Sequence, residues 1–130
     1  GLRDTIPVGE VLPMKAGSAA QVLLAWDDPD RLARVLPTAR FSATTLAGVR
    51  RRGWAQSVGE RERGVASVSA PVRSHRGRVV AAVSVSGPID RLTRQPGRLH
   101  AEAVVDAGLA LSDALAATSA PLEAARGHTR

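Results

Sequence analysis

The chain has 130 residues, of which 44% are hydrophobic and 23% are charged, so it suits one domain and is too short for two well-developed cores. It contains no cysteine, which excludes disulfide scaffolds, thiolate zinc sites and cysteine nucleophiles. No stretch approaches the roughly 20 apolar residues of a membrane span, and the first residues lack the apolar core of a signal peptide, so the expected address is the cytoplasm.

The formal net charge of +6 comes almost wholly from arginine, because Lys15 is the only lysine among 18 basic residues. A basic surface suits polyanions, whereas arginines scattered along a chain are typical of a solvated surface. The aromatic residues are only Trp26, Phe41 and Trp54, too few for the stacking platforms of single-strand nucleic-acid binders. A nucleic-acid-binding module is therefore an alternative function rather than the first.

The N-terminal part of the chain predicts an extended entry followed by a helix. Two prolines and a glycine lie too close together for a helix in Ile6–Pro13, so extended chain and turns are expected there. Small residues followed by good helix formers predict a helix from near Ser18 to Trp26, and the Ser18 hydroxyl can cap its first turn.

Two further helices are marked by their end signals. Asp27–Asp30 offers an N-cap and a proline to a short second helix over Arg31–Leu36. A third helix starts at Ser42 or Thr44 and ends at Gly53, its C-cap.

Three strands follow the helices. A short strand is expected over Trp54–Ser57, and a polar, glycine-punctuated loop leads from it to two longer strands, Val65–Val72 and Val79–Ser86. The six residues Arg73–Arg78 between them indicate a hairpin connection somewhat longer than the commonest ones. A symmetric turn makes one face of the hairpin apolar and gathers serines on the other, with Ser67 opposite Ser84, Val65 opposite Ser86 and Ser69 opposite Ala82.

A polar crossing over Ile89–Gly97 leads to a long last helix, predicted from Leu99 to Thr118. We expect residues 1–118 to form the domain and Ser119–Arg130 to be a disordered tail. Acidic residues share one side of this helix, and the side expected to pack on the sheet carries Val104, Gly108, Leu111 and Leu115.

Signs of catalysis or metal binding are few. His75, His100 and His128 lie in a turn, a helix and the tail, without the spacing of metal ligands, so no metal or other cofactor is expected. There is no phosphate-binding loop or nucleophile elbow, and Glu60 and Glu62 lie in a loop of alternating charges, which is typically solvated. A small enzyme that uses Glu60 and the serines is thus a second alternative.

The sequence favours a binding pocket more strongly than an active site. Hydroxyls in a row on one sheet face, beside apolar Val65, are the few polar groups within apolar walls that small-molecule sites use. The opposing interpretation is a sheet face wetted by solvent. Unpaired N–H groups at the small residues Gly17–Ala19 can receive an anion, unless Ser18 simply caps the helix.

Three segments together resemble the C-terminal effector-binding domain of the isocitrate lyase regulator (IclR) family of bacterial transcription regulators. The middle segment, Val49–Val72, carries an Arg-Arg-Arg-Gly-Trp motif, a Gly-Glu loop and an Ala-Pro-Val strand. The others are the Leu-Pro segment Val8–Ala19 and Ala81–Pro88, which ends in Ser-Val-Ser-Gly-Pro. Their order and spacing make the resemblance specific over roughly Val8 to Thr118.

The resemblance implies an α+β, GAF-like domain, in which helices pack a twisted antiparallel sheet, that binds a small organic or aromatic acid and associates with itself as a dimer or tetramer. No membrane partner or catalysis is implied, and Arg50–Arg52 belongs to this domain rather than to a DNA-reading element. The family's effector-contacting positions fall at Leu12, Ser18, Ala19, Ser57, Val65, Ser67, Ser84 and Ser86.

This chain also departs from the family's pattern. Ala20-Gln21 stands where members usually have Gly-Lys, members often have an acid near the Ser57 position, and the connection Pro37–Thr45 is short. These departures leave the identity of the effector open. The family's winged helix-turn-helix and the first strands of the effector domain are expected to be absent, so the fold would be N-terminally truncated and DNA would be contacted only through that N-terminal domain.

Overall fold

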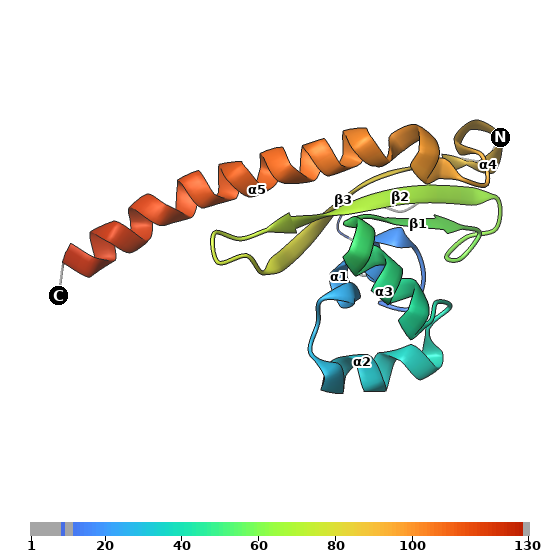
Figure 1. Cartoon of the computed structure of the whole chain (residues 1–130), viewed down its shortest axis with the longest axis horizontal. Coiled ribbons are helices and arrows are strands. Elements are labelled where there is room, and N and C mark those ends of the chain that lie inside the picture. The colour runs from blue at the N-terminus through green and yellow to red at the C-terminus, as the bar shows by residue number, and fades with distance from the viewer. Residues whose placement is uncertain (1–8, 10–11, 129–130) are drawn as a thin grey trace.

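The computed structural model describes Gly9 and residues 12–128, with side chains described as far as Thr118. Most of the predicted extended entry therefore lies outside the described residues. The described chain forms an antiparallel sheet in the order β1 (Ala55–Val58), β2 (Val65–Arg73), β3 (Val79–Pro88), with helices on both faces (Figure 1). This confirms the predicted α+β fold.

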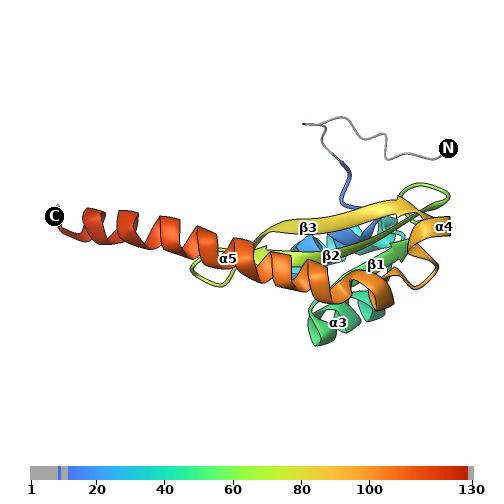
Figure 2. The same ribbon diagram turned by 90° about the horizontal axis from the view of Figure 1, so that it is seen from above.

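The two faces of the sheet are covered by different helices. Helix α1 (Ser18–Ala25) packs on one face, with α3 (Ala43–Arg52) packed against it, and α5 (Pro96–His128) runs along the other face (Figures 1 and 2). Two buried apolar clusters result. The first is centred on Val22, Leu24, Leu46 and Val49, and the second on Val68, Ala70 and Val104.

Helix α1 begins where the sequence predicts, but Ser18 is not its cap. The N-cap is Gly17, whose φ of 94° lies in the region that L side chains avoid, and as a glycine it has no side chain to cap the helix. Ser18 is instead the first helical residue and is buried. Its hydroxyl is therefore available for contacts with the sheet.

The ends of the next helices follow local capping rules. The Asp28 side chain accepts a hydrogen bond from the Arg31 N–H (2.9 Å) and starts α2 (Pro29–Val35), two residues earlier than predicted because proline fits the first helical position. A 3-10 turn, η1 (Leu36–Thr38), follows it. Ser42, rather than Thr44, caps α3.

The hairpin register differs from the symmetric prediction. Ser67 pairs with Ser86, Ser69 with Ser84 and Val65 with Pro88, each shifted by two residues along β3. The connection is one residue shorter than predicted, because Arg73 pairs with Val79, and a bulge beside this pair inserts Val80 opposite no partner. An even shift leaves every side chain beyond the bulge on its predicted face.

The last part of the chain is more helical than predicted. A single helical turn, α4 (Ile89–Leu92), forms within the expected polar crossing, and its Leu92 is buried. Helix α5 starts at Pro96 and continues ten residues past the predicted end at Thr118, although that stretch contains Pro121 and Gly127. The domain boundary expected at residue 118 stays a prediction.

Only the first half of the predicted apolar side of α5 meets the sheet. Val104 and Gly108 are buried as predicted, whereas Leu111 and Leu115 are 47% and 39% exposed. The helix runs on past the end of β2 and projects from the molecule, so nothing described covers its later turns (Figure 2). Within the described range, no helix combines the length and apolar character needed to cross a membrane.

Candidate functional site

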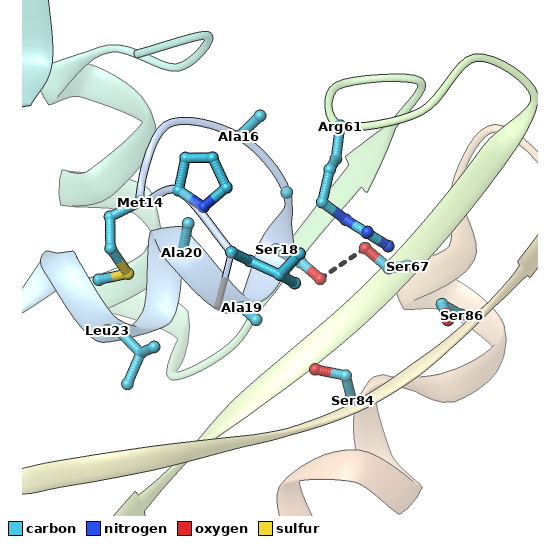
Figure 3. A pocket seen from close by; sticks show the side chains of 13 residues that line it. Met14, Ala16, Ser18, Ala19, Ala20, Leu23, Arg61, Ser67, Ser84 and Ser86 are labelled. Atoms are coloured by element: carbon cyan, nitrogen blue, oxygen red, sulfur yellow. Dashed lines mark hydrogen bonds between the residues drawn. The ribbon is translucent and has the colours of Figure 1, made fainter. Parts of the chain in front are cut away.

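A cavity of about 390 Å³ opens between the start of α1, the β2–β3 hairpin and the loop that joins β1 to β2 (Figure 3). Its walls are mainly apolar, and its polar groups are hydroxyls and one arginine. This combination suits a small molecule held by a few oriented polar contacts. The lining residues are Leu12, Pro13, Met14, Ala16, Gly17, Ser18, Ala19, Ala20, Leu23, Arg61, Ser67, Ser84 and Ser86.

The structure brings six of the eight sequence-predicted site residues to this cavity. They are Leu12, Ser18, Ala19, Ser67, Ser84 and Ser86. Ser57 and Val65 share the sheet face with the serines of β2 but are buried outside the lining, at 6% and 7% exposure. Both therefore lie behind the wall of the cavity rather than on it.

Five serine hydroxyls form a continuous chain behind and along the cavity wall. Ser18 Oγ lies 2.6 Å from Ser67 Oγ and 2.7 Å from Ser69 Oγ. The chain extends from Ser67 to Ser57 (2.8 Å) and from Ser69 to Ser84 (2.6 Å). The chain ties α1 to all three strands. The hydroxyls on this face of the sheet therefore bond to one another, whereas on a solvated face they would bond to water.

The loop between β1 and β2 is fastened to the start of α1 through Glu60. Glu60 Oε1 accepts a hydrogen bond from the Gly17 N–H (3.0 Å), and Oε2 accepts one from Gln21 Nε2 (2.9 Å). The unpaired N–H groups and the dipole of a helix start favour a carboxylate there. The expectation of a merely solvated Glu60 is therefore wrong.

Ser18 and Ala19 come next along α1, and both residues line the cavity. No side chain among the described residues accepts a hydrogen bond from the N–H group of either. Ala19 is exposed, so its backbone can be approached closely. Neither N–H group is therefore taken by a side chain as the Gly17 N–H is.

Arg61 is the lining residue of most chemical consequence that sequence reasoning missed. It is the only charged side chain among the described lining residues. A usable signal existed: Arg61 lies in the loop joining the strand of Ser57 to the strand of Ser67, and such a loop must sit at one end of their shared face.

Two of the three arginines at the end of α3, Arg50 and Arg52, are engaged with the protein itself. Arg50 Nη1 donates to the Ala25 carbonyl (2.7 Å), and the Arg52 guanidinium lies over the Trp54 ring, 4.3 Å from its centroid. Partial burial, and then the charge of Arg51, lower the pKa of Arg52 from its ordinary value. These contacts hold the end of α3 rather than presenting a row of free cations.

Comparison with known proteins shows which family this chain is similar to. The family model of the bacterial transcriptional regulator IclR C-terminal domain matches residues 2–113. The regulator XynR of Escherichia coli is 33% identical over 83% of this chain and 48% of its own length, and the glycerol operon regulatory protein of Streptomyces griseus is 33% identical over 95% and 51%.

A solved structure of a candidate IclR regulator from Silicibacter has a TM-score of 0.76 and 29% identity, covering 86% of this chain and 49% of that one. The chain thus spans about half the length of the proteins it matches. With the family model matched over most of its length, the chain belongs to the IclR family of bacterial transcriptional regulators and corresponds to their C-terminal domain. The resemblance seen in its motifs is confirmed.

Proposed function

We propose that this chain is the effector-sensing and self-associating domain of an IclR-type transcription regulator, and that the cavity beside α1 binds a small organic acid. The observation that carries the proposal is the meeting of serine hydroxyls, helix-start N–H groups and one guanidinium around an apolar cavity. Hydroxyls orient a ligand, while N–H groups and a cation favour a negative charge on it.

The rest of the proposed role follows from the relatives. The name of XynR describes a helix-turn-helix regulator about twice as long as the match, so we assign DNA contact to another part of the regulator, in the cytoplasm. Ligand binding would act by its different affinity for two states of the assembly. Exposed Leu109, Leu111 and Leu115 on the projecting half of α5 support self-association.

The experiment that tests the proposal compares carboxylic acids with their primary amides. Pyruvate and benzoate are titrated against the chain by calorimetry, beside pyruvamide and benzamide. We expect each binding acid to bind several-fold more tightly than its amide, because a helix start alone contributes about 0.3 to 1 kcal/mol toward an anion. Equal affinities of acid and amide would refute the anion site, and salt-sensitive binding of duplex DNA without acid binding would favour the nucleic-acid alternative.

Removing the Ser84 hydroxyl should weaken binding of the preferred acid by roughly 0.5 to 1.5 kcal/mol, the net value of an ordinary neutral hydrogen bond. Ser84 is exposed at the cavity wall, so the Ser84→Ala variant is expected to fold. Ser74→Ala, in the hairpin turn and outside the cavity, is the matched control and should leave the calorimetric affinity unchanged. Unchanged affinity in both variants would remove Ser84 from the site.

A further inference from the structure

Glu60 and Arg61 are neighbours in the β1–β2 loop and carry opposite charges. Glu60 bonds to the start of α1, whereas Arg61 lines the cavity. Glu60 is held three times: its carboxylate accepts from the Gly17 N–H and from Gln21 Nε2, and its backbone carbonyl accepts from Arg40 Nη1 (2.6 Å). Such a residue has little freedom to move. Its neighbour Arg61 is therefore placed by the anchor rather than by its own contacts.

Arg61 lies across the start of α1 at the mouth of the cavity. A Cβ built on Gly17 would lie 3.6 Å from Arg61 Cβ and 3.8 Å from its Cδ and Nε, so the stem of the arginine passes directly over the glycine. Figure 3 shows the guanidinium extending from there toward Ser67. These are ordinary van der Waals distances, so the stem of Arg61 packs directly against the start of α1.

The guanidinium of Arg61 also forms no ion pair within the described part of the chain. No carboxylate there lies within ion-pair distance of it, and Glu60, the nearest acid in sequence, is used at the helix start. A guanidinium offers a rigid fork of donors that matches the two oxygens of a carboxylate. A half-buried cation facing hydroxyls in an apolar cavity is thus matched by an anionic ligand.

We propose that Arg61 is the residue that makes the cavity selective for carboxylates, and that Glu60 is a positioning residue that holds Arg61 over it. This assignment rests on the proposed effector-binding function and names its specificity determinant. The hydroxyls do not distinguish an acid from its amide by charge, and the helix start contributes only about 0.3 to 1 kcal/mol toward an anion. The charge of Arg61 would therefore supply most of the preference for an acid over its amide.

The test uses titrations of benzoate and benzamide, with pyruvate and pyruvamide as a second pair, against the wild-type chain and four variants. In Arg61→Gln we expect benzoate affinity to fall by about tenfold, the scale of one charge-assisted hydrogen bond, with benzamide affinity within about twofold of wild type. Arg61→Lys should keep most of the acid preference, since it keeps the charge. Arg63→Gln, an exposed residue of the same loop, is the matched control.

Glu60→Ala distinguishes positioning from simple charge. Removing a negative charge near the cavity raises anion affinity if only Coulomb attraction matters. If Glu60 positions Arg61, the same variant lowers the ratio of acid to amide affinity, because the guanidinium is no longer held over the ligand. A raised ratio in Glu60→Ala would overturn the positioning role.

The outcomes separate this proposal from the function on which it rests. Equal losses of acid and amide affinity in Arg61→Gln, or an equal loss in Arg63→Gln, would overturn the role of Arg61 and leave the cavity as an effector site. Failure of the wild-type chain to bind any of the four probes would overturn both. Loss of the acid preference in Arg61→Gln alone, with Arg61→Lys retaining it, would support both.

Discussion

Replacing Gly108 with alanine should lower the free energy of unfolding by about 1 to 3 kcal/mol, although alanine is the better helix former. Gly108 lies inside α5 where the helix crosses β2. A Cβ added there would lie 2.6 Å from the Pro71 carbonyl oxygen, which is a backbone atom and cannot swing aside. The helix would have to lift from the sheet and open the cluster around Val104.

Gly48→Ala is the matched control and should change stability in the opposite direction. Gly48 also lies inside a helix, α3, but a Cβ there meets only the flexible ends of Arg52 and Arg51, at 3.4 and 3.7 Å. The gain in helix propensity should then raise stability by up to about 1 kcal/mol. Urea unfolding followed by tryptophan fluorescence measures both variants. A stabilised Gly108→Ala variant would show that α5 does not sit this close to β2.

The elements were predictable wherever a local signal specified them. The signals in Asp27–Asp30, at Ser42 or Thr44, and at Gly53 each act within one helical turn. The structure places a helix end at each, with Asp28, Ser42 and Gly53 as the caps. The hairpin register was not predictable in this way, because it depends on a turn of five rather than six residues and on a bulge at Val80. Neither has a strong signature in the sequence.

The serine face of the cavity was nevertheless predictable despite the wrong register. Alternation places Ser67, Ser69, Ser84 and Ser86 on one face under any even shift, so the error of two residues cost nothing there. The point at which α5 stops packing on the sheet could not be predicted from the sequence. Leu111 matches the periodicity of Val104, but only the three-dimensional end of β2 decides that Leu111 has nothing to pack on.

The second large effect on stability is expected where the chain of serine hydroxyls around Ser18 is broken. Each serine hydroxyl donates one hydrogen bond and accepts others, so the four contacts of the chain from Ser57 to Ser84 use four of its five protons. One proton is left to point out of the chain. Ser84 is the exposed end, and a carboxylate accepting from it would set all five hydroxyls in one direction.

Ser69→Ala should therefore lower the free energy of unfolding by about 1 to 3 kcal/mol, since it removes a fully buried group with two short hydrogen bonds and leaves Ser18 short of a partner. Ser18→Ala should cost a similar amount, and the two losses should not add, because both break the same Ser18–Ser69 contact. We expect a coupling free energy of roughly 0.5 kcal/mol or more in the double-mutant cycle.

The control is Ser84→Ala, which removes a hydroxyl of the same chain from its exposed end, where water can replace it, and it should cost less than about 1 kcal/mol. Urea unfolding of the three single variants and the Ser18→Ala/Ser69→Ala double variant supplies every value needed. Additive losses at Ser18 and Ser69 would mean that the two hydroxyls do not bond to each other in solution. A Ser84→Ala loss as large as that of Ser69→Ala would mean that burial is not what makes the inner hydroxyls costly to remove.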